Sequence, residues 1–218
     1  MEISNYTQLP SEQKLKKILL SQAALDIILL EEEDDWLRLT SFYKNYFPDV
    51  DMARIDNGAG DHIYFLFSKD GVIIKGFDHE SAFSPYANDK GEIAKGIYDS
   101  VPKELMNLLD ESVEREGVTF CVWKSPNDVL WRKGDVVIPK GYDDDGEGFL
   151  LGYIFSHAGR WLDWAKGYYE EQAENIQVDC VEKIYKHERI TRDLIKEINP
   201  KRDTATAIKE LEEIGYTI

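Results

Sequence analysis

Two Asp-His pairs flank an apolar segment of the chain and offer side chains that could do chemistry. The first pair is Asp61 and His62, and the second is Asp78 and His79, which Glu80 follows directly. Imidazole and carboxylate groups bind divalent metals and also serve as general acids and bases. The pattern therefore suits a metal-assisted hydrolase in which His62, Asp78 and His79 hold a divalent metal. Glu80 or Asp61 would then act as the general base.

A β-hairpin must bring these two pairs together. The segments 62–68 (HIYFLFS) and 72–77 (VIIKGF) are rich in β-branched and aromatic residues, and the residues 69–71 (KDG) between them are typical of a tight turn. Antiparallel pairing across this turn would place both Asp-His pairs at the open end of the hairpin. The alternative interpretation is structural: Asp61 and Asp78 accept backbone hydrogen bonds in turns, and the histidines are partly buried partners.

Other motifs in the sequence do not indicate an activity. Residues 57–60 (NGAG) resemble a phosphate-binding loop but lack its lysine and its following helix, which favours a simple turn. Residues 143–147 (DDDGE) lack the full pattern of a calcium loop, so we expect a solvated hairpin loop there. No Gly-x-Ser-x-Gly elbow occurs, and Cys121 lies in an apolar run, where a thiol behaves as a small buried hydrophobe.

The charge balance fits either an ordinary, well-solvated acidic surface or a surface that binds a basic partner. The chain has 218 residues, with 26 Lys and Arg against 42 Asp and Glu, which gives a formal net charge of -16. Such a field repels nucleic acid and anionic lipid, and it suits a basic protein partner or cation binding. Residues 1–10 lack the basic and apolar regions of a signal peptide, and the longest aliphatic run, 27–30, is too short to span a membrane. We therefore expect a cytoplasmic protein that binds neither nucleic acid nor membranes.

Helical periodicity is found at both ends of the chain. Ser11 is typical of an N-cap, and apolar residues recur at helical spacing over 11–30. The acidic run 31–35 is predicted to be either a solvated link or the first turn of a second helix. The apolar face of that second helix would consist of Trp36, Leu39, Tyr43, Tyr46 and Phe47. A further helix is expected over 156–174, and short helices are expected over 175–218.

The remaining apolar segments are predicted to be strands. Besides the hairpin, segments rich in β-branched and aromatic residues lie at 52–56, 118–124, 129–132, 136–139 and 149–155. The chain is therefore predicted to have an α+β fold, with an antiparallel sheet of about six strands packed against helices. Residues 1–174 would form the main domain, and residues 175–218 a helical C-terminal extension packed on it.

Parts of the sequence resemble known bacterial proteins. The segment 55–86 (IDNGAGDHIYFLFSKDGVIIKGFDHESAFSPY), together with the short runs FCVW and FLLGYIF, resembles a family of uncharacterised bacterial proteins. That resemblance implies no catalytic residues. The helix-first layout, the acidic composition and the Asn57-Gly58 turn are similar to those of SUKH-type immunity proteins, which neutralise secreted bacterial toxins. This second resemblance implies a protein that binds a partner and carries out no reaction.

Two hypotheses follow from the sequence. The first is a non-enzymatic, acidic binding protein, such as an immunity protein, whose negative face docks a basic protein and whose aromatic residues anchor it. It needs no cofactor. The alternative is the small metal-assisted hydrolase, which needs a divalent metal at the Asp-His cluster. The two hypotheses differ in whether the imidazoles of His62 and His79 converge in a pocket.

Overall fold

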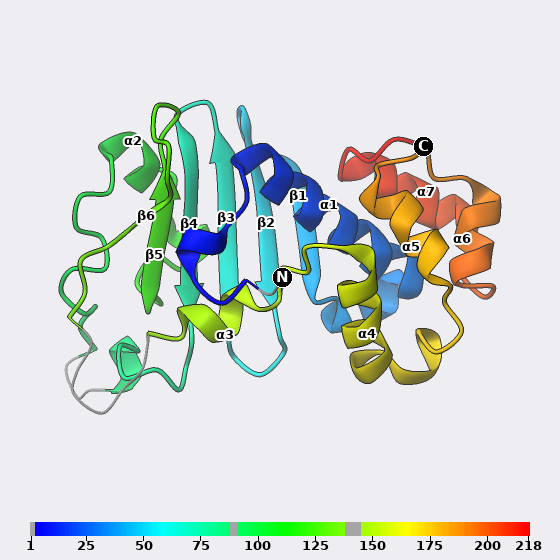
Figure 1. Ribbon diagram of the computed structural model, residues 1–218, viewed down its shortest axis with the longest axis horizontal. Coiled ribbons are helices and arrows are strands. Elements are labelled where there is room, and N and C mark those ends of the chain that lie inside the picture. The colour runs from blue at the N-terminus through cyan, green and yellow to red at the C-terminus, as the bar shows by residue number, and fades with distance from the viewer. Residues whose placement is uncertain (1–2, 88–90, 138–144) are drawn as a thin grey trace.

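A six-stranded antiparallel sheet forms one end of the molecule (Figure 1). The computed structural model describes residues 3–87, 91–137 and 145–218. Each strand pairs with its neighbours in the sequence, so the order in the sheet is β1 to β6. The strands are β1 (Thr40–Phe47), β2 (Val50–Asp56), β3 (His62–Ser68), β4 (Gly71–Phe77), β5 (Phe120–Lys124) and β6 (Arg132–Lys133). The predicted α+β fold, with about six antiparallel strands packed against helices, is confirmed.

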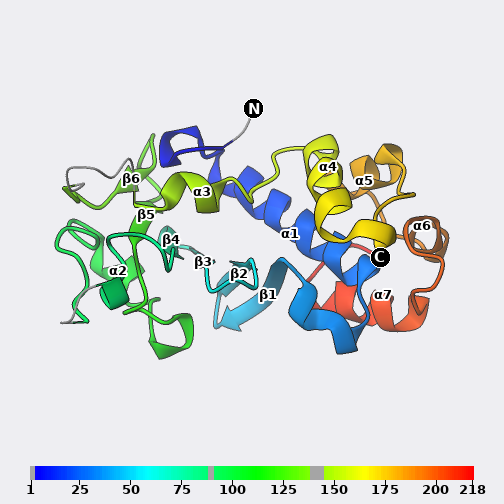
Figure 2. The same ribbon diagram turned by 90° about the horizontal axis from the view of Figure 1, so that it is seen from below.

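Helices cover the sheet and extend beyond its β1 edge. The α-helices are α1 (Glu12–Leu29), α2 (Lys103–Met106), α3 (Glu147–Leu151), α4 (Ala158–Tyr168), α5 (Val178–Tyr185), α6 (Arg192–Ile198) and α7 (Thr204–Glu213). The 3₁₀ helices are η1 (Tyr6–Gln8), η2 (Glu32–Leu37), η3 (Pro85–Ala87), η4 (Glu111–Val113) and η5 (Glu170–Gln172). Figure 2 shows α1 and α3 on one face of the sheet, α2 on the other, and α4 to α7 gathered beyond β1. Within the described ranges, no helix has the length and apolar character needed to cross a membrane.

The β3–β4 hairpin has the register that the sequence predicts. Ser68 pairs with Gly71 beside the tight turn, and His62 pairs with Phe77 at the open end. Gly71 has a φ of +125°, and a Cβ there would lie 2.3 Å from the carbonyl oxygen of Lys124 in β5. The turn therefore needs glycine at this position, both for its backbone conformation and for the close approach of β5.

The two faces of the sheet pack against different hydrophobic clusters. In β3, Ile63, Phe65 and Phe67 belong to the larger cluster, which also contains the apolar face of α1. Tyr64 and Leu66 belong to a second cluster, which contains apolar residues of α2 and its flanking segments. Successive residues of one strand therefore meet different environments.

Residues 40–47 form strand β1, whereas the sequence predicts a helix with an aromatic face there. Only η2, which precedes β1, is helical in this region. Thr40 pairs with Ile55 of β2, and Phe42 enters the larger hydrophobic cluster. Thr, Phe and Tyr favour strands, and pairing with β2 outweighs the helical spacing of Tyr43 and Phe47. The prediction of a second helix is therefore wrong.

The predicted strands after residue 128 are also largely wrong. β6 contains only Arg132 and Lys133. Val129 and Leu130 are exposed, and in this segment the buried apolar residue is Trp131. Residues 136–137 are not in a strand, and 138–139 lie outside the described residues. Helix α3 takes up the start of the predicted strand 149–155, because a short apolar run fits a buried helix as well as a strand.

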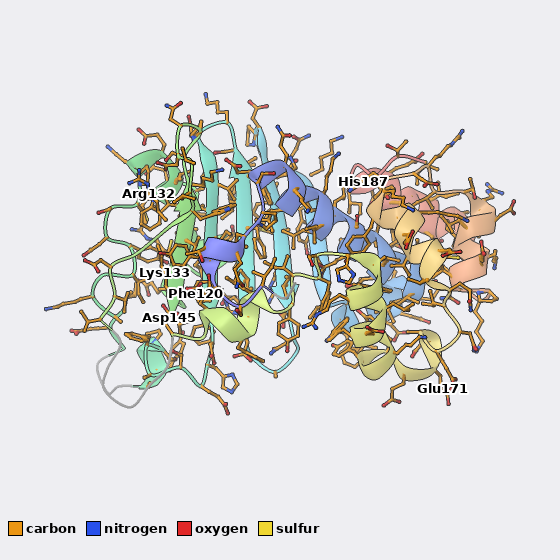
Figure 3. All side chains as sticks on the ribbon, in the orientation of Figure 1. Phe120, Arg132, Lys133, Asp145, Glu171 and His187 are labelled. Carbon is orange, nitrogen blue, oxygen red and sulfur yellow. The ribbon has the colours of Figure 1, made fainter. Side chains whose placement is uncertain are left out.

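Asp145, just before α3, and Glu147, the first residue of α3, are buried, although a solvated loop is predicted there. Asp145 and Glu147 are 1% and 4% exposed. Lys133 of β6 lies 2.8 Å from Asp145 Oδ2 and also forms an ion pair with Glu147 (Figure 3). The ion pairs compensate the burial of these charges and tie α3 to β6. Residues 143–144 of the predicted loop lie outside the described residues.

The predicted helices at the two ends of the chain are found with changed bounds. α1 covers most of the predicted segment 11–30. α4 is shorter than the predicted segment 156–174. It begins after its N-cap, His157, and ends at Tyr168. The His157 side chain accepts a hydrogen bond from the backbone N–H of Arg160 at 3.3 Å.

The helices after residue 174 pack on α1. Ile184, Ile195 and Leu211, from α5, α6 and α7, lie in the same hydrophobic cluster as α1. Arg202, between α6 and α7, is fully buried and donates a hydrogen bond to the Ile27 carbonyl oxygen of α1 at 2.9 Å. Both apolar and polar contacts therefore join this segment to α1, while a domain boundary at residue 174 stays a prediction.

Candidate functional site

Asp61 and His79 form the centre of the predicted Asp-His cluster. Both lie just outside the strands, at the open end of the β3–β4 hairpin. Asp61 Oδ1 accepts a hydrogen bond from the backbone N–H of His79 at 2.9 Å and lies 2.6 Å from His79 Nδ1. Asp61 Oδ2 accepts a hydrogen bond from the Asn57 side chain at 2.7 Å. Asp61 thus accepts hydrogen bonds in a turn, as the structural interpretation of the sequence expects.

Asp78 joins Asp61 and His79 in a group of metal-binding side chains. One ligand atom from each residue lies within 4.8 Å of the others. Asp78 Oδ1 accepts the backbone N–H of Glu80 at 2.9 Å, and the Glu80 side chain is 85% exposed. Because both oxygens of Asp61 already accept hydrogen bonds, a metal ion bound by this group would have to replace some of them.

The charges in this group shift three pKa values. Burial raises the pKa of Asp61, but hydrogen bonds from His79 and Asn57 outweigh burial and leave that pKa below its usual value. The hydrogen bond with Asp61 raises the pKa of His79. Burial, together with the nearby charge of Asp61, raises the pKa of Asp78. The group therefore stabilises a charged Asp61–His79 pair. Beside it, the Asp78 carboxyl group binds a proton more easily than an ordinary aspartate does.

His62 lies outside this group. Its Nε2 atom lies 3.3 Å from Lys75 Nζ and 3.4 Å from Glu114 Oε2. Burial, together with the charge of Lys75, lowers the pKa of His62 to about 4. The imidazoles of His62 and His79 thus contact different residues, because His62 lies within β3 and its side chain takes the face of the sheet opposite to α1.

A buried lysine is a feature that the sequence analysis does not identify. Lys75 of β4 is 0% exposed, and its Nζ atom donates hydrogen bonds to the carbonyl oxygens of Val113 at 3.0 Å and Glu114 at 2.9 Å. The same atom lies 5.0 Å from the centroid of the Tyr64 ring. Burial lowers the pKa of Lys75 to about 7. Lys75 therefore links η4 to the sheet through these hydrogen bonds. In the sequence, Lys75 is marked only as the single charged residue within the apolar run VIIKGF.

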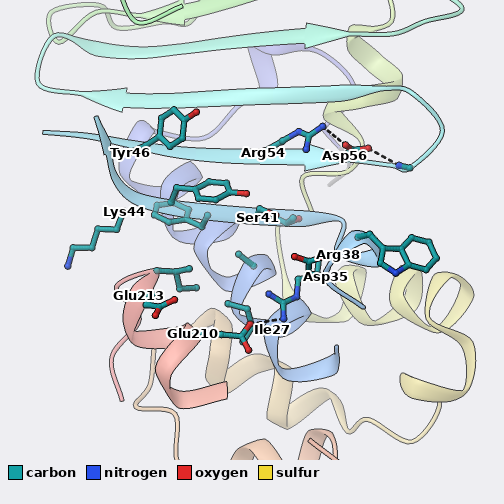
Figure 4. A pocket seen from close by; sticks show the side chains of 17 residues that line it. Ile27, Asp35, Arg38, Ser41, Lys44, Tyr46, Arg54, Asp56, Glu210 and Glu213 are labelled. Carbon is teal, nitrogen blue, oxygen red and sulfur yellow. Dashed lines mark hydrogen bonds and ion pairs between the residues drawn. The ribbon is translucent and has the colours of Figure 1, made fainter. Parts of the chain in front are cut away.

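A cavity of about 850 Å³ lies beside β1, away from the Asp61 group (Figure 4). β1 and α7 line two of its sides, and α1 contributes Ala23 and Ile27. The sequence analysis places no site here. It could not do so, because η2, β1 and α7 come together only through the folding of the whole chain.

Aromatic rings and guanidinium groups line this cavity. Trp36 and Tyr43 are 73% and 44% exposed. Arg38 and Arg54 also line it, and Arg38 Nη2 lies 2.6 Å from Glu210 Oε2 of α7. Tryptophan, tyrosine and arginine are the residue types that contribute most to binding at protein interfaces. The lining therefore has the composition of a protein-binding surface.

An exposed acidic segment borders the cavity. η2 begins with four carboxylates, all exposed, at residues 32–35. Asp35 and the following Trp36 both line the cavity. Asp35 lies at the cavity, the three carboxylates before it add negative potential next to it, and exposed charges of this kind attract a basic partner.

The chain matches no known protein family, no curated protein and no solved structure. Two sites of this chain have a geometry and charge that could serve a function, namely the Asp61 group and the cavity beside β1.

Proposed function

We propose that this chain is a non-enzymatic binding protein that docks a basic protein partner at the cavity beside β1. The observation that carries the proposal is the rim formed by η2, where four exposed carboxylates directly precede the exposed Trp36. Carboxylates attract a basic partner over a distance, and tryptophan offers a large apolar contact once the partner arrives. The formal net charge of -16 has the sign that this proposal needs.

The residues around Trp36 support a protein partner. Tyr43, Arg38 and Arg54 line the same cavity, so its lining contains both aromatic rings and charged groups. Interfaces commonly combine aromatic and arginine anchors with a polar rim. An immunity protein that binds a basic toxin is one form of this function, and it is the form that the resemblance to SUKH-type proteins suggests.

A comparison of two charge variants tests the proposal. The first variant neutralises η2 through Glu32→Gln, Glu33→Gln, Asp34→Asn and Asp35→Asn. The matched control neutralises four exposed acidic residues that do not line the cavity, through Glu170→Gln, Glu171→Gln, Glu174→Gln and Asp179→Asn. Glu171, for example, projects outward at the end of the molecule opposite to the sheet (Figure 3). Both variants lose the same net charge.

In a pull-down from the cells that produce this chain, we expect the unmodified protein and the control to retain a basic protein at low salt. The η2 variant should retain at least about tenfold less, because the lost attraction is local. High salt should release the partner from all three proteins. A result in which no partner is retained, or in which both variants behave alike, would contradict the proposal.

A metal-assisted hydrolase is a second proposal, favoured by the grouping of Asp61, Asp78 and His79 within 4.8 Å. On this proposal, zinc or manganese added to the protein should release heat in calorimetry. Asp78→Asn should abolish that heat. His62→Gln is the matched control and should leave the heat unchanged, because His62 contacts Lys75 and not this group. If the unmodified protein gives no heat, the second proposal fails.

A further inference from the structure

The cavity runs along the open edge of the sheet. Among the described strands, β1 stands at the end of the sheet order, next to β2. Each of the five residues 40–44 lines the cavity. Strand side chains alternate between the two faces, so a cavity that contacts consecutive residues must border the edge of the strand. The backbone of β1 therefore faces the cavity.

Two hydrogen bonds show which backbone groups of β1 face outward. The Leu39 carbonyl accepts a hydrogen bond from Asp56 of β2 at 2.9 Å, so this carbonyl points toward β2. The Thr40 N–H donates instead to Asp26 Oδ2 of α1 at 2.8 Å, so it points away from β2. Backbone groups alternate along an antiparallel strand. The N–H and C=O groups of Phe42 therefore also point away from β2. We infer the same direction for Lys44, which follows the last regular β1–β2 pair at Tyr43.

We propose that the partner places an extended, basic segment beside β1 and so adds a strand to the sheet. This inference rests on the proposed function and names how the partner is held. Phe42 and Lys44 exchange backbone hydrogen bonds with the added segment, as other proteins do when they bind peptides at a sheet edge. The segment is short, because the β1–β2 register shifts between Tyr43 and Phe47 and Asn45 has a φ of +52°.

The charges favour a basic segment over a second copy of the chain. Figure 4 shows Glu213 of α7 near the Lys44 end of the cavity and Asp35 near Arg38. Arg38 is already paired with Glu210. Two copies of the chain would bring two formal charges of -16 together and repel each other, whereas a basic segment is attracted.

A defined peptide tests this binding mode. The probe is a capped heptapeptide of alternating lysine and valine, in its plain form and with alternate backbone amides N-methylated in either of the two frames. Binding to the unmodified protein is measured by titration calorimetry. We expect the plain peptide to bind, one methylated frame to bind as well as the plain peptide, and the other to bind at least about tenfold more weakly, because it loses the hydrogen bonds to β1. Equal binding of both frames, or no binding of the plain peptide, would overturn the inference.

Variants of Lys44 test the same hydrogen bonds from the side of the protein. Lys44→Pro removes an N–H that points away from β2, where proline is tolerated on an edge strand. Lys44→Ala is the matched control, because it loses the same side chain and keeps the N–H. We expect Lys44→Pro to bind the plain peptide at least about tenfold more weakly than Lys44→Ala, with the same thermal midpoint. Equal affinity of two folded variants would overturn the inference.

The two proposals fail in distinguishable ways. If the pull-down partner depends on η2 but binds Lys44→Pro and Lys44→Ala equally, the proposed function stands and strand addition fails. If no partner is retained at all, the proposed function fails, whatever the peptide does. A dimer that forms with rising concentration in sedimentation, and that Lys44→Pro breaks, would assign the edge to a second copy and overturn the basic segment.

Discussion

Replacing Asp26 with asparagine should stabilise the protein at pH 8 by up to about 4 kcal/mol, while leaving it nearly unchanged at pH 4. Asp26 lies in α1 and is 1% exposed. Burial raises the pKa of Asp26 to about 7, although hydrogen bonds from Thr40 and Tyr169 and the charge of Arg38 act in the opposite direction. Asp26 Oδ1 has no hydrogen-bond partner among the described residues.

The sign of this effect follows from proton uptake. In the unfolded chain the Asp26 carboxyl has its ordinary pKa of about 4, so between about pH 4 and pH 7 the folded state binds more protons than the unfolded state. The free energy of unfolding therefore falls as the pH rises through this window, and the full cost is present above pH 7. Asparagine is neutral at every pH and keeps an oxygen for the Thr40 N–H.

Urea denaturation at pH 4, 6 and 8 measures this effect. Asp99→Asn, at an exposed site, is the control and should change the free energy of unfolding by less than about 0.5 kcal/mol at each pH. If Asp26→Asn is less stable than the unmodified protein at pH 8, the charged carboxylate stabilises the fold. That result would contradict the expectation that burial makes this charge destabilising.

Replacing Lys75 with methionine should lower the free energy of unfolding by about 2–3 kcal/mol. Methionine fills a similar volume but donates no hydrogen bond. The carbonyl oxygens of Val113 and Glu114 would lose the ammonium group that lies 3.0 and 2.9 Å away. Hydrogen exchange should therefore speed up in the segment that follows η4, which the lysine holds against the sheet.

Lys69→Met is the matched control for this change. Lys69 lies in the exposed turn between β3 and β4, and its replacement should cost less than about 0.5 kcal/mol. Urea denaturation of both variants at pH 6 measures the difference. If Lys75→Met is as stable as Lys69→Met, the lysine does not hold η4 to the sheet.

The centre of the sheet could be predicted because its signals are local. The alternation in 62–68 and the tight turn before Gly71 fix the register of β3 and β4 through neighbouring residues alone. That register also places Asp61 beside His79, as the hairpin argument expects. His62 stays apart from this group because it lies in β3, where its side chain takes the same face as Tyr64, and the sequence itself carries this alternation.

The edges of the fold could not be predicted, since tertiary contacts decide them. Tyr43, Tyr46 and Phe47 have the spacing of a helix face, and only pairing with β2 shows that 40–47 is a strand. The apolar run that begins at Phe149 could form a short helix or a strand. In the structure its first residues belong to α3, which follows Gly146 and buries Leu150 and Leu151.

The cavity beside β1 has no sequence signal of its own. Its residues come from η2, β1 and α7, which are far apart in the chain. The sequence predicts the negative charge, but it places Trp36 on the apolar face of a helix, whereas Trp36 is 73% exposed and lines the cavity. The proposed binding surface can be located only in the folded chain, where η2, β1 and α7 lie together.

A site-specific photo-crosslink tests the central claim most directly. A photoreactive benzoylphenylalanine is placed at position 36, and in a separate protein at position 171, which is exposed and does not line the cavity. After irradiation with the pull-down partner, we expect a covalent adduct from position 36 and none from position 171. An adduct from position 171 alone, or equal adducts from both positions, would contradict binding of the partner at the cavity beside β1.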